Sequence, residues 1–215
     1  MYTATLLRAL GRNVAVVEVS GHGDGALTWA RHASQRDKPL PFPVYTLRQY
    51  PDIAEDVDVI FDSTPRVEDF TAAALLADRL VLCVDAGGMV HHTLQLELSL
   101  LQKLGVGCSG SAFGVLLTGA ADPLTLLELP EELTAQEVWE WREDWAQLQQ
   151  LVAELLQDFS ARSLPVLGVI PHREVHLAAG FTCPQYLHDH HRVLGRFLGV
   201  DHLMPPHRSP STWSP

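Results

Sequence analysis

The stretch from Asp56 to Leu104 constrains the fold most, because it holds two apolar runs that are each followed by a helical pattern. Val57 to Asp62 is a β-branched run that ends at a carboxylate, and Leu80 to Asp85 is a second run of the same kind. Two such strands joined by a helix are expected to be parallel neighbours with a right-handed crossover. The sequence therefore predicts a parallel α/β sheet.

Strand and helix patterns alternate over the rest of the chain. Further strands are predicted at Val14–Val19, Val44–Leu47, Phe113–Thr118 and Val166–Ile170, the last stopped by Pro171. Helices are predicted at Thr3–Leu10, Leu27–Ala33, Gln136–Phe159, His172–Ala179 and Pro184–Leu198. This alternation indicates a mostly parallel sheet with helices on both faces. We expect one α/β domain over residues 1–204 and a loose, Pro- and Ser-rich tail over residues 205–215.

Composition and charge exclude several classes of function. The formal net charge of −11 argues against a dedicated nucleic-acid binder, which needs clustered Lys and Arg, although Arg192 and Arg196 leave nonspecific DNA contact open. No apolar run approaches the roughly 20 residues of a membrane span, and the N-terminus lacks the pattern of a signal peptide. We therefore expect a cytoplasmic protein. Cys83 lies in a predicted strand, where we expect a small buried residue.

Asp62 is the first candidate functional residue. A carboxylate at the C-terminal end of a buried parallel strand lies where open α/β sheets place their ligand chemistry. Together with the hydroxyls of Ser63 and Thr64 it is suited to hold Mg²⁺ through water beside a phosphate. The structural alternative is that Asp62 caps the turn that follows the strand.

A glycine-rich turn, GHGDGA, follows the first predicted strand. Gly21, Gly23 and Ala26 satisfy the GxGxxA pattern of dinucleotide-binding folds, which brings a pyrophosphate to a helix N-terminus. A ribose-binding acid is then expected at the end of the next strand, but that strand ends in Arg48 and Gln49. The pattern is therefore more consistent with an ordinary glycine-rich turn.

Two other patterns have a structural and a functional interpretation. His188 and His191 are one helical turn apart and could share a metal, but no third ligand has convincing spacing, so we expect a solvated polar face. In the longest helix, apolar residues at steps of three and four form a stripe: Val138, Trp141, Trp145, Leu148, Val152, Leu155 and Phe159. We expect this stripe to pack on the sheet. The alternative is a helix seam with a second subunit.

Five segments in order, NVAVVEVSGHGDGALTWA, DVDVIFDSTP, LLADRLVLCVDAGGMVHHTLQLELSLLQKLG, FGVLLTGAAD and LPVLGVIPHREVHLAAGF, resemble the ParA/MinD family of partition and positioning ATPases. The resemblance covers Thr3 to Leu198. It implies a P-loop NTPase-like fold, ATP and Mg²⁺ as ligands, a homodimer, and a protein adaptor or cargo.

The resemblance also implies roles for particular residues. Asp62 would be the Walker B acid on the Mg²⁺ shell, with Thr64 beside it, and Thr118 would stand near the base. Pro171 and Arg173 would flank the purine pocket. The two acids of the family's D-x-D segment correspond to Glu18 and Ser20 in this sequence, and the second of them, at Ser20, is the one tied to hydrolysis in the family. A hydroxyl at the second position cannot replace a carboxylate in polarising water.

One departure from the family concerns the phosphate loop. The family begins with a strand and a KGGxGKT loop, whereas no G-x-x-x-x-G-K-[ST] pattern occurs in this sequence. We therefore expect a ParA/MinD-like protein whose nucleotide binding is lost or weakened, and its ATPase activity remains an open question. One alternative is an active partition ATPase whose N-terminal part, with the loop, is absent from this chain. A second is a dinucleotide-binding protein that uses the GxGxxA turn.

The missing first strand also has a consequence for the sheet. In the family it lies between the Walker B strand and the strand that corresponds to Leu80–Asp85. Its loss would leave two edges unpaired, at ~1 to 3 kcal/mol for each buried and unsatisfied group. We expect the two flanking strands to pair directly, or Tyr2–Leu7 to act as a strand. The third solution is a segment that precedes Met1 in the natural protein.

Overall fold

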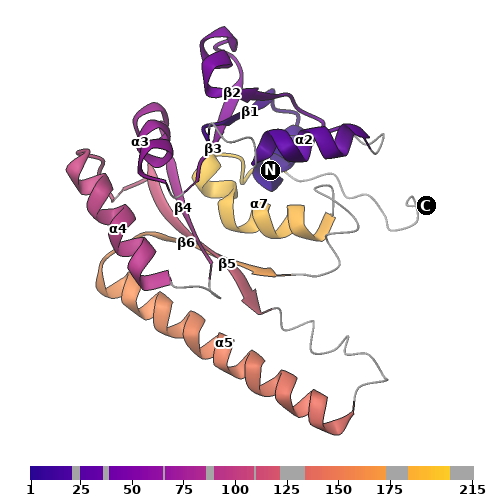
Figure 1. Cartoon of the computed structure of the whole chain (residues 1–215), viewed down its shortest axis with the longest axis vertical. Helices are drawn as coiled ribbons and strands as arrows, with labels where there is room; N and C mark the ends of the chain where they lie inside the picture. The colour runs from indigo at the N-terminus through magenta and orange to yellow at the C-terminus, as the bar shows by residue number, and fades with distance from the viewer. Residues whose placement is uncertain are drawn as a thin grey trace. The chain divides into compact units, whose positions relative to one another are not determined.

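The structure is a computed structural model that describes residues 1–20, 25–35, 39–64, 66–85, 90–108, 110–121, 134–172 and 184–203. Strands and helices alternate along the chain, as Figure 1 shows. The chain divides into two compact units, which we call unit 1 (Met1–Ala77 and Ala178–Pro215) and unit 2 (Asp78–Leu177). All strand pairs are parallel, so the predicted α/β class with a parallel sheet is confirmed.

Unit 1 contains a three-stranded parallel sheet in the order β2-β1-β3. Its strands are β1 (Val14–Glu18), β2 (Val44–Thr46) and β3 (Asp58–Asp62). The central strand is buried along its whole length, as expected for a β-branched run in a parallel sheet. Register pairs Glu18 with Thr46 on one side and with Asp62 on the other. The carboxylates of Glu18 and Asp62 therefore lie at the same edge of the sheet.

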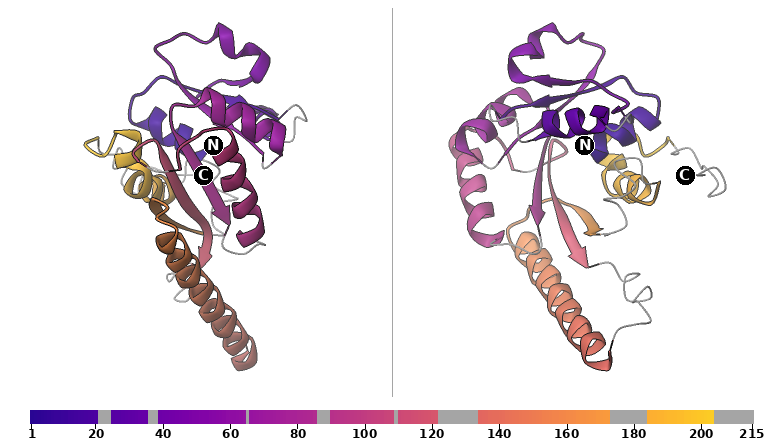
Figure 2. Two further views of the ribbon diagram at one scale, coloured as in Figure 1. Left: turned by 90° about the vertical axis from the view of Figure 1, so that its left-hand side faces the viewer. Right: turned by 45° about the vertical axis from the view of Figure 1, so that its right-hand side comes forward.

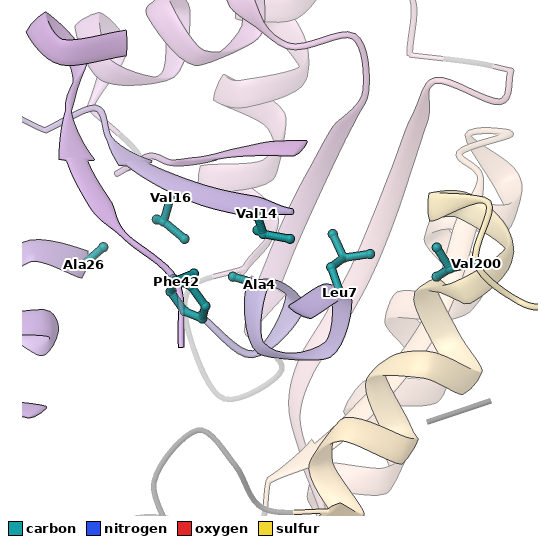
Figure 3. Packing of buried hydrophobic residues seen from close by; sticks show 7 residues of the cluster. All are labelled: Ala4, Leu7, Val14, Val16, Ala26, Phe42 and Val200. Carbon is teal, nitrogen blue, oxygen red and sulfur yellow. The ribbon is translucent and has the colours of Figure 1, made fainter. Parts of the chain in front are cut away.

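The helical elements of unit 1 are α1 (Tyr2–Ala9), α2 (Ala26–Gln35), the 3-10 helix η1 (Leu47–Asp52), α3 (Val67–Leu76) and α7 (Pro184–Leu198). Helix α1 ends where Gly11 takes a φ of +82°, a conformation that glycine adopts without strain. Buried apolar side chains of α1, β1, α2, the segment before β2 and the segment after α7 form one core, shown in Figure 3: Ala4, Leu7, Val14, Val16, Ala26, Phe42 and Val200. This core fixes β1 and the start of α2 in unit 1.

Unit 2 contains a second three-stranded parallel sheet in the order β4-β5-β6. Its elements are β4 (Leu80–Asp85), α4 (Val90–Lys103), β5 (Phe113–Ala121), α5 (Ala135–Ala161) and β6 (Val166–His172). The predicted end of the last strand at Ile170 was wrong, because β6 continues through Pro171 to His172. Pro171 is tolerated there because β6 is the last strand of this sheet and its pairing with β5 is irregular.

In the described residues, β3 is the last strand of the sheet in unit 1 and β4 is the last strand of the sheet in unit 2. The predicted direct pairing between them stays a prediction. The alternative that Tyr2–Leu7 acts as a strand was wrong, because this segment lies in α1, where the consecutive residues Ala4 to Leu7 are buried. All five residues of β3 are half-buried. A half-buried strand can leave its amide groups in contact with water, which lowers the penalty for leaving an edge unpaired.

The exposure of Cys83 corrects a further prediction. Leu82 and Val84 on β4 are buried, whereas Cys83 and Asp85 are exposed. This alternation is typical of a strand that is covered on one face. The expected small core residue is therefore a surface thiol.

The C-terminal part of the apolar stripe of α5 is buried in unit 2, where α5 contacts β5 and β6, as predicted for the stripe. Val152, Leu155 and Phe159 are buried, and Trp145 and Leu148 are half-buried. The side chains of Val138 and Trp141 lie outside the described residues, as do the predicted helix beyond His172 and the predicted tail. The single domain over residues 1–204 stays a prediction. Within the described residues, no helix combines the length and the apolar character needed to cross a membrane.

Candidate functional site

The side chain of Glu18 is almost completely buried at the end of β1, with 2% of its surface exposed. Its Oε2 accepts a hydrogen bond from the backbone N–H of Leu27 at 2.7 Å, and its Oε1 accepts one from the hydroxyl of Ser20 at 3.3 Å. Leu27 lies in the first turn of α2, where backbone N–H groups lack intrahelical acceptors. The buried carboxylate therefore caps the N-terminus of α2, a position that favours negative charge.

Asp62 lies beside Glu18 at the end of β3. The backbone N–H of Val19 donates to the backbone carbonyl of Asp62 at 3.0 Å, which ties the two strand ends together. A Cβ placed on Gly25 would lie 3.1 Å from Oε2 of Glu18 and 3.4 Å from Oδ2 of Asp62. Both carboxylates therefore approach the backbone of Gly25, just before α2. The sequence-based prediction named both carboxylates but missed Gly25, because its approach to them depends on where α2 packs.

Thr64 stabilises the start of α3. Its hydroxyl donates to Oδ2 of Asp69 at 2.6 Å, and the backbone N–H of Arg66 donates to the same hydroxyl at 3.4 Å. The hydroxyl of Ser63 also donates to the backbone carbonyl of Thr64 at 3.1 Å. Ser63, Thr64 and Asp69, not Asp62, therefore make the side-chain contacts of this turn. The predicted alternative that Asp62 caps the turn has no contact to support it in the described residues.

Two of the remaining candidate residues lie in unit 2. Thr118 ends the buried run of β5, and its hydroxyl donates to the carbonyl of Val84 at 3.4 Å. Pro171 lies on β6, where it pairs with Ala120, and Arg173 lies outside the described residues. The predicted residues therefore fall into a group at the β1 and β3 ends of unit 1 and a second group in unit 2.

The carboxylates of the group in unit 1, Glu18 and Asp62, have the oxygen ligands that hard cations such as Mg²⁺ prefer. Carboxylate oxygens are preferred ligands of Mg²⁺, which usually retains several waters and is completed by phosphate oxygens. Glu18 and Asp62 supply such oxygens at one sheet edge, and Oε2 of Glu18 is already engaged by Leu27. No group of three or more His, Cys, Asp or Glu in the described part could hold a metal ion by itself. The residues therefore fit Mg²⁺ held partly by water or a ligand.

The cap on α2 bears on the dinucleotide hypothesis. A pyrophosphate on the GxGxxA turn would require free N–H groups at the N-terminus of the following helix. In this chain the N–H of Leu27 is occupied by the buried carboxylate of Glu18, which would also repel a phosphate. Residues 21–24 lie outside the described residues, but the contacts of α2 disfavour a dinucleotide.

Comparison with known proteins yields one similarity, and it concerns the fold. No family model matches the sequence, and no curated protein matches it. A solved structure of a proposed plasmid partition protein from Borrelia burgdorferi B31, bound to AMPPNP, is similar to this chain with a TM-score of 0.58 and 13% sequence identity. The similarity covers 92% of this chain and 90% of that one. The α/β architecture is therefore shared with that protein over nearly the whole length of both chains.

Proposed function

We propose that this chain is a ParA/MinD-like partition or positioning protein. The proposal is supported by the fold shared with a proposed plasmid partition protein over most of both chains. The observation in the chain itself is the convergence of Glu18 and Asp62 on Gly25 at the ends of two parallel strands. In this proposal the protein works in the cytoplasm as a homodimer that binds an adaptor or cargo protein.

We further propose that its nucleotide binding is weak. Charge-assisted hydrogen bonds from a lysine and a nest of amides supply most of the grip on a triphosphate, and the sequence has no G-x-x-x-x-G-K-[ST] segment to provide them. The two carboxylates repel phosphate unless a cation lies between them, which is the role that Mg²⁺ at Asp62 would have. Ser20 cannot act as a carboxylate in polarising water.

Calorimetric titration with MgATP tests the nucleotide proposal. We expect no measurable heat at micromolar protein. A clear micromolar dissociation constant that Asp62→Asn weakens would contradict weak binding and support the alternative of an ATPase. A micromolar constant that Asp62→Asn leaves unchanged would contradict both weak binding and the assignment of Asp62.

A genetic experiment tests the partition role itself. Deletion of the gene should raise the loss rate of a replicon, or should displace a cellular assembly from its usual position. The wild-type gene should restore the phenotype. The role would be contradicted if deletion changed neither inheritance nor position, whatever the outcome of the MgATP titration.

A further inference from the structure

The N-terminal half of α5 has an exposed face in unit 2 that carries a tryptophan. The buried part of α5 is its C-terminal portion, where Leu155 and Phe159 have no exposed surface. Before this portion, α5 continues beyond the ends of β5 and β6, as all three views in Figures 1 and 2 show. Trp139 lies in that first part with 57% of its surface exposed. An exposed tryptophan on an uncovered helix face is typical of an interaction surface.

Trp139 does not belong to the stripe that packs on the sheet. It precedes Trp145 by six residues, which places it about 120° round the helix from that stripe. Its neighbours at helical spacing are small or polar and are all exposed: Ala135, Arg142, Glu143 and Ala146. We call these four residues and Trp139 the Trp139 face. The alanines let another chain approach the helix closely, and the indole offers a large contact area at low entropic cost.

The charges beside the Trp139 face are unequally distributed. Three exposed carboxylates, those of Glu140, Glu143 and Asp144, lie along one side of it, about 40° to 140° round the helix from Trp139. Arg142 is the single cation, on the other side. The side chain of Glu140 accepts a hydrogen bond from Gln136 at 2.7 Å, which holds part of this acidic edge in place. A partner that covers Trp139 would therefore meet negative charge along one edge.

We propose that the Trp139 face binds a cationic amphipathic segment of a partner protein, with an apolar side chain on the indole and Lys or Arg along the acidic edge. Complementary charge steers such a segment to the surface, and a cation can also stack on the indole. A second copy of this chain fits less well. Antiparallel pairing would bring the acidic edges together, and parallel pairing would set three acids against one Arg142. This inference stands independently of the proposed partition role.

A binding experiment with the full chain tests the proposal. The probe is a fluorescent synthetic peptide of leucine and lysine in amphipathic helical register, and its fluorescence anisotropy reports binding. We expect binding that weakens with added salt. Trp139→Ala should weaken it about tenfold or more, as for an aromatic residue at the centre of an interface. The matched control is Trp29→Ala, which removes a 48% exposed tryptophan from α2 in unit 1 and should leave binding unchanged.

A second variant tests the charge component separately. Glu143→Lys combined with Asp144→Lys should weaken peptide binding about fivefold at low ionic strength and flatten its salt dependence. Both positions are exposed, so the fold should be retained, and circular dichroism checks this. The proposal is overturned if the two tryptophan variants bind alike, or if a leucine–glutamate peptide binds as well as the lysine peptide. It is also overturned if sedimentation shows a wild-type dimer that Trp139→Ala dissociates.

Discussion

The central strands of the two sheets, β1 and β5, are buried alike but end in different chemistry. In β1 the buried run leads into Glu18, whose carboxylate accepts a backbone N–H from α2 and lies near Asp62. In β5 the buried run leads into Thr118, a neutral residue whose hydroxyl donates to a carbonyl of β4 at 3.4 Å. The central strand of the sheet in unit 1 therefore ends in a buried carboxylate, and the central strand of the sheet in unit 2 leads into a hydroxyl.

This difference indicates that the end of β1 needs hydrogen bonds as well as packing, because it holds a buried carboxylate. A buried carboxylate is costly unless hydrogen bonds compensate for its lost hydration. Unit 1 supplies that compensation from the first turn of α2 and from Ser20. A neutral strand end such as Thr118 needs no such arrangement. We therefore expect substitutions at the end of β1 to have larger effects than those at the end of β5.

Glu18→Ala should have the largest effect, a loss of about 3 kcal/mol in the free energy of unfolding. The substitution opens a cavity and leaves the N–H of Leu27 without its acceptor. Glu18→Gln is the matched control, because its amide oxygen can still accept that hydrogen bond, and it should lose much less. Urea unfolding followed by circular dichroism measures both. Equal losses in the two variants would show that the negative charge, which both substitutions remove, accounts for the role of Glu18, and not its volume or its hydrogen bond.

Gly25→Ala should have the next largest effect, with a loss of about 1 kcal/mol of stability from overpacking. The new Cβ would lie 3.1 Å from a carboxylate oxygen that is buried and fixed by Leu27, so that oxygen has little freedom to move. The same urea experiment in a Glu18→Ala background should give a smaller loss, because the obstructing carboxylate is gone. An equal loss in both backgrounds would refute the close approach.

The sequence predicted the elements of this site better than their contacts. Asp62 could be placed at a strand end, because a β-branched run that stops at a carboxylate is a local pattern, whereas Glu18 lay within the predicted strand Val14–Val19 and was named only through the family resemblance. Gly25 could not be identified, because its approach to both carboxylates depends on where α2 packs. Strand order follows the same logic. Local patterns predicted six strands, but pairing is a tertiary property, and neither the strand order within each sheet nor the exposure of Cys83 could be read from them.

Thr118→Val should have a small effect, about 0.5 kcal/mol, because it removes one long hydrogen bond and conserves side-chain volume. Thr64→Val is a useful comparison in unit 1, since the bond from Thr64 to Asp69 is much shorter, at 2.6 Å, and its acceptor is a carboxylate. We expect the larger loss from Thr64→Val in thermal unfolding. The contrast between the two units would fail if Thr118→Val were as destabilising as Glu18→Ala.

Glu97→Gln should have the smallest effect on stability, and the size of that effect should depend on pH. Glu97 is a half-buried carboxylate on α4 in unit 2, and burial raises its pKa. The folded state then holds the proton of Glu97 more tightly than the unfolded chain does. The stability of the wild type therefore falls as pH rises from the ordinary pKa of a glutamate, about 4.3, through the raised pKa of Glu97 in the folded state. Glu97→Gln avoids this loss. It should therefore be slightly more stable than wild type near neutral pH, and the gain should disappear in acid.

Urea unfolding across this pH range measures the difference in stability, with Glu55→Gln at an exposed position as the control. A gain that persists unchanged in acid would mean that the desolvated charge is not its cause, and the contrast between a compensated carboxylate in unit 1 and an uncompensated one in unit 2 would be lost.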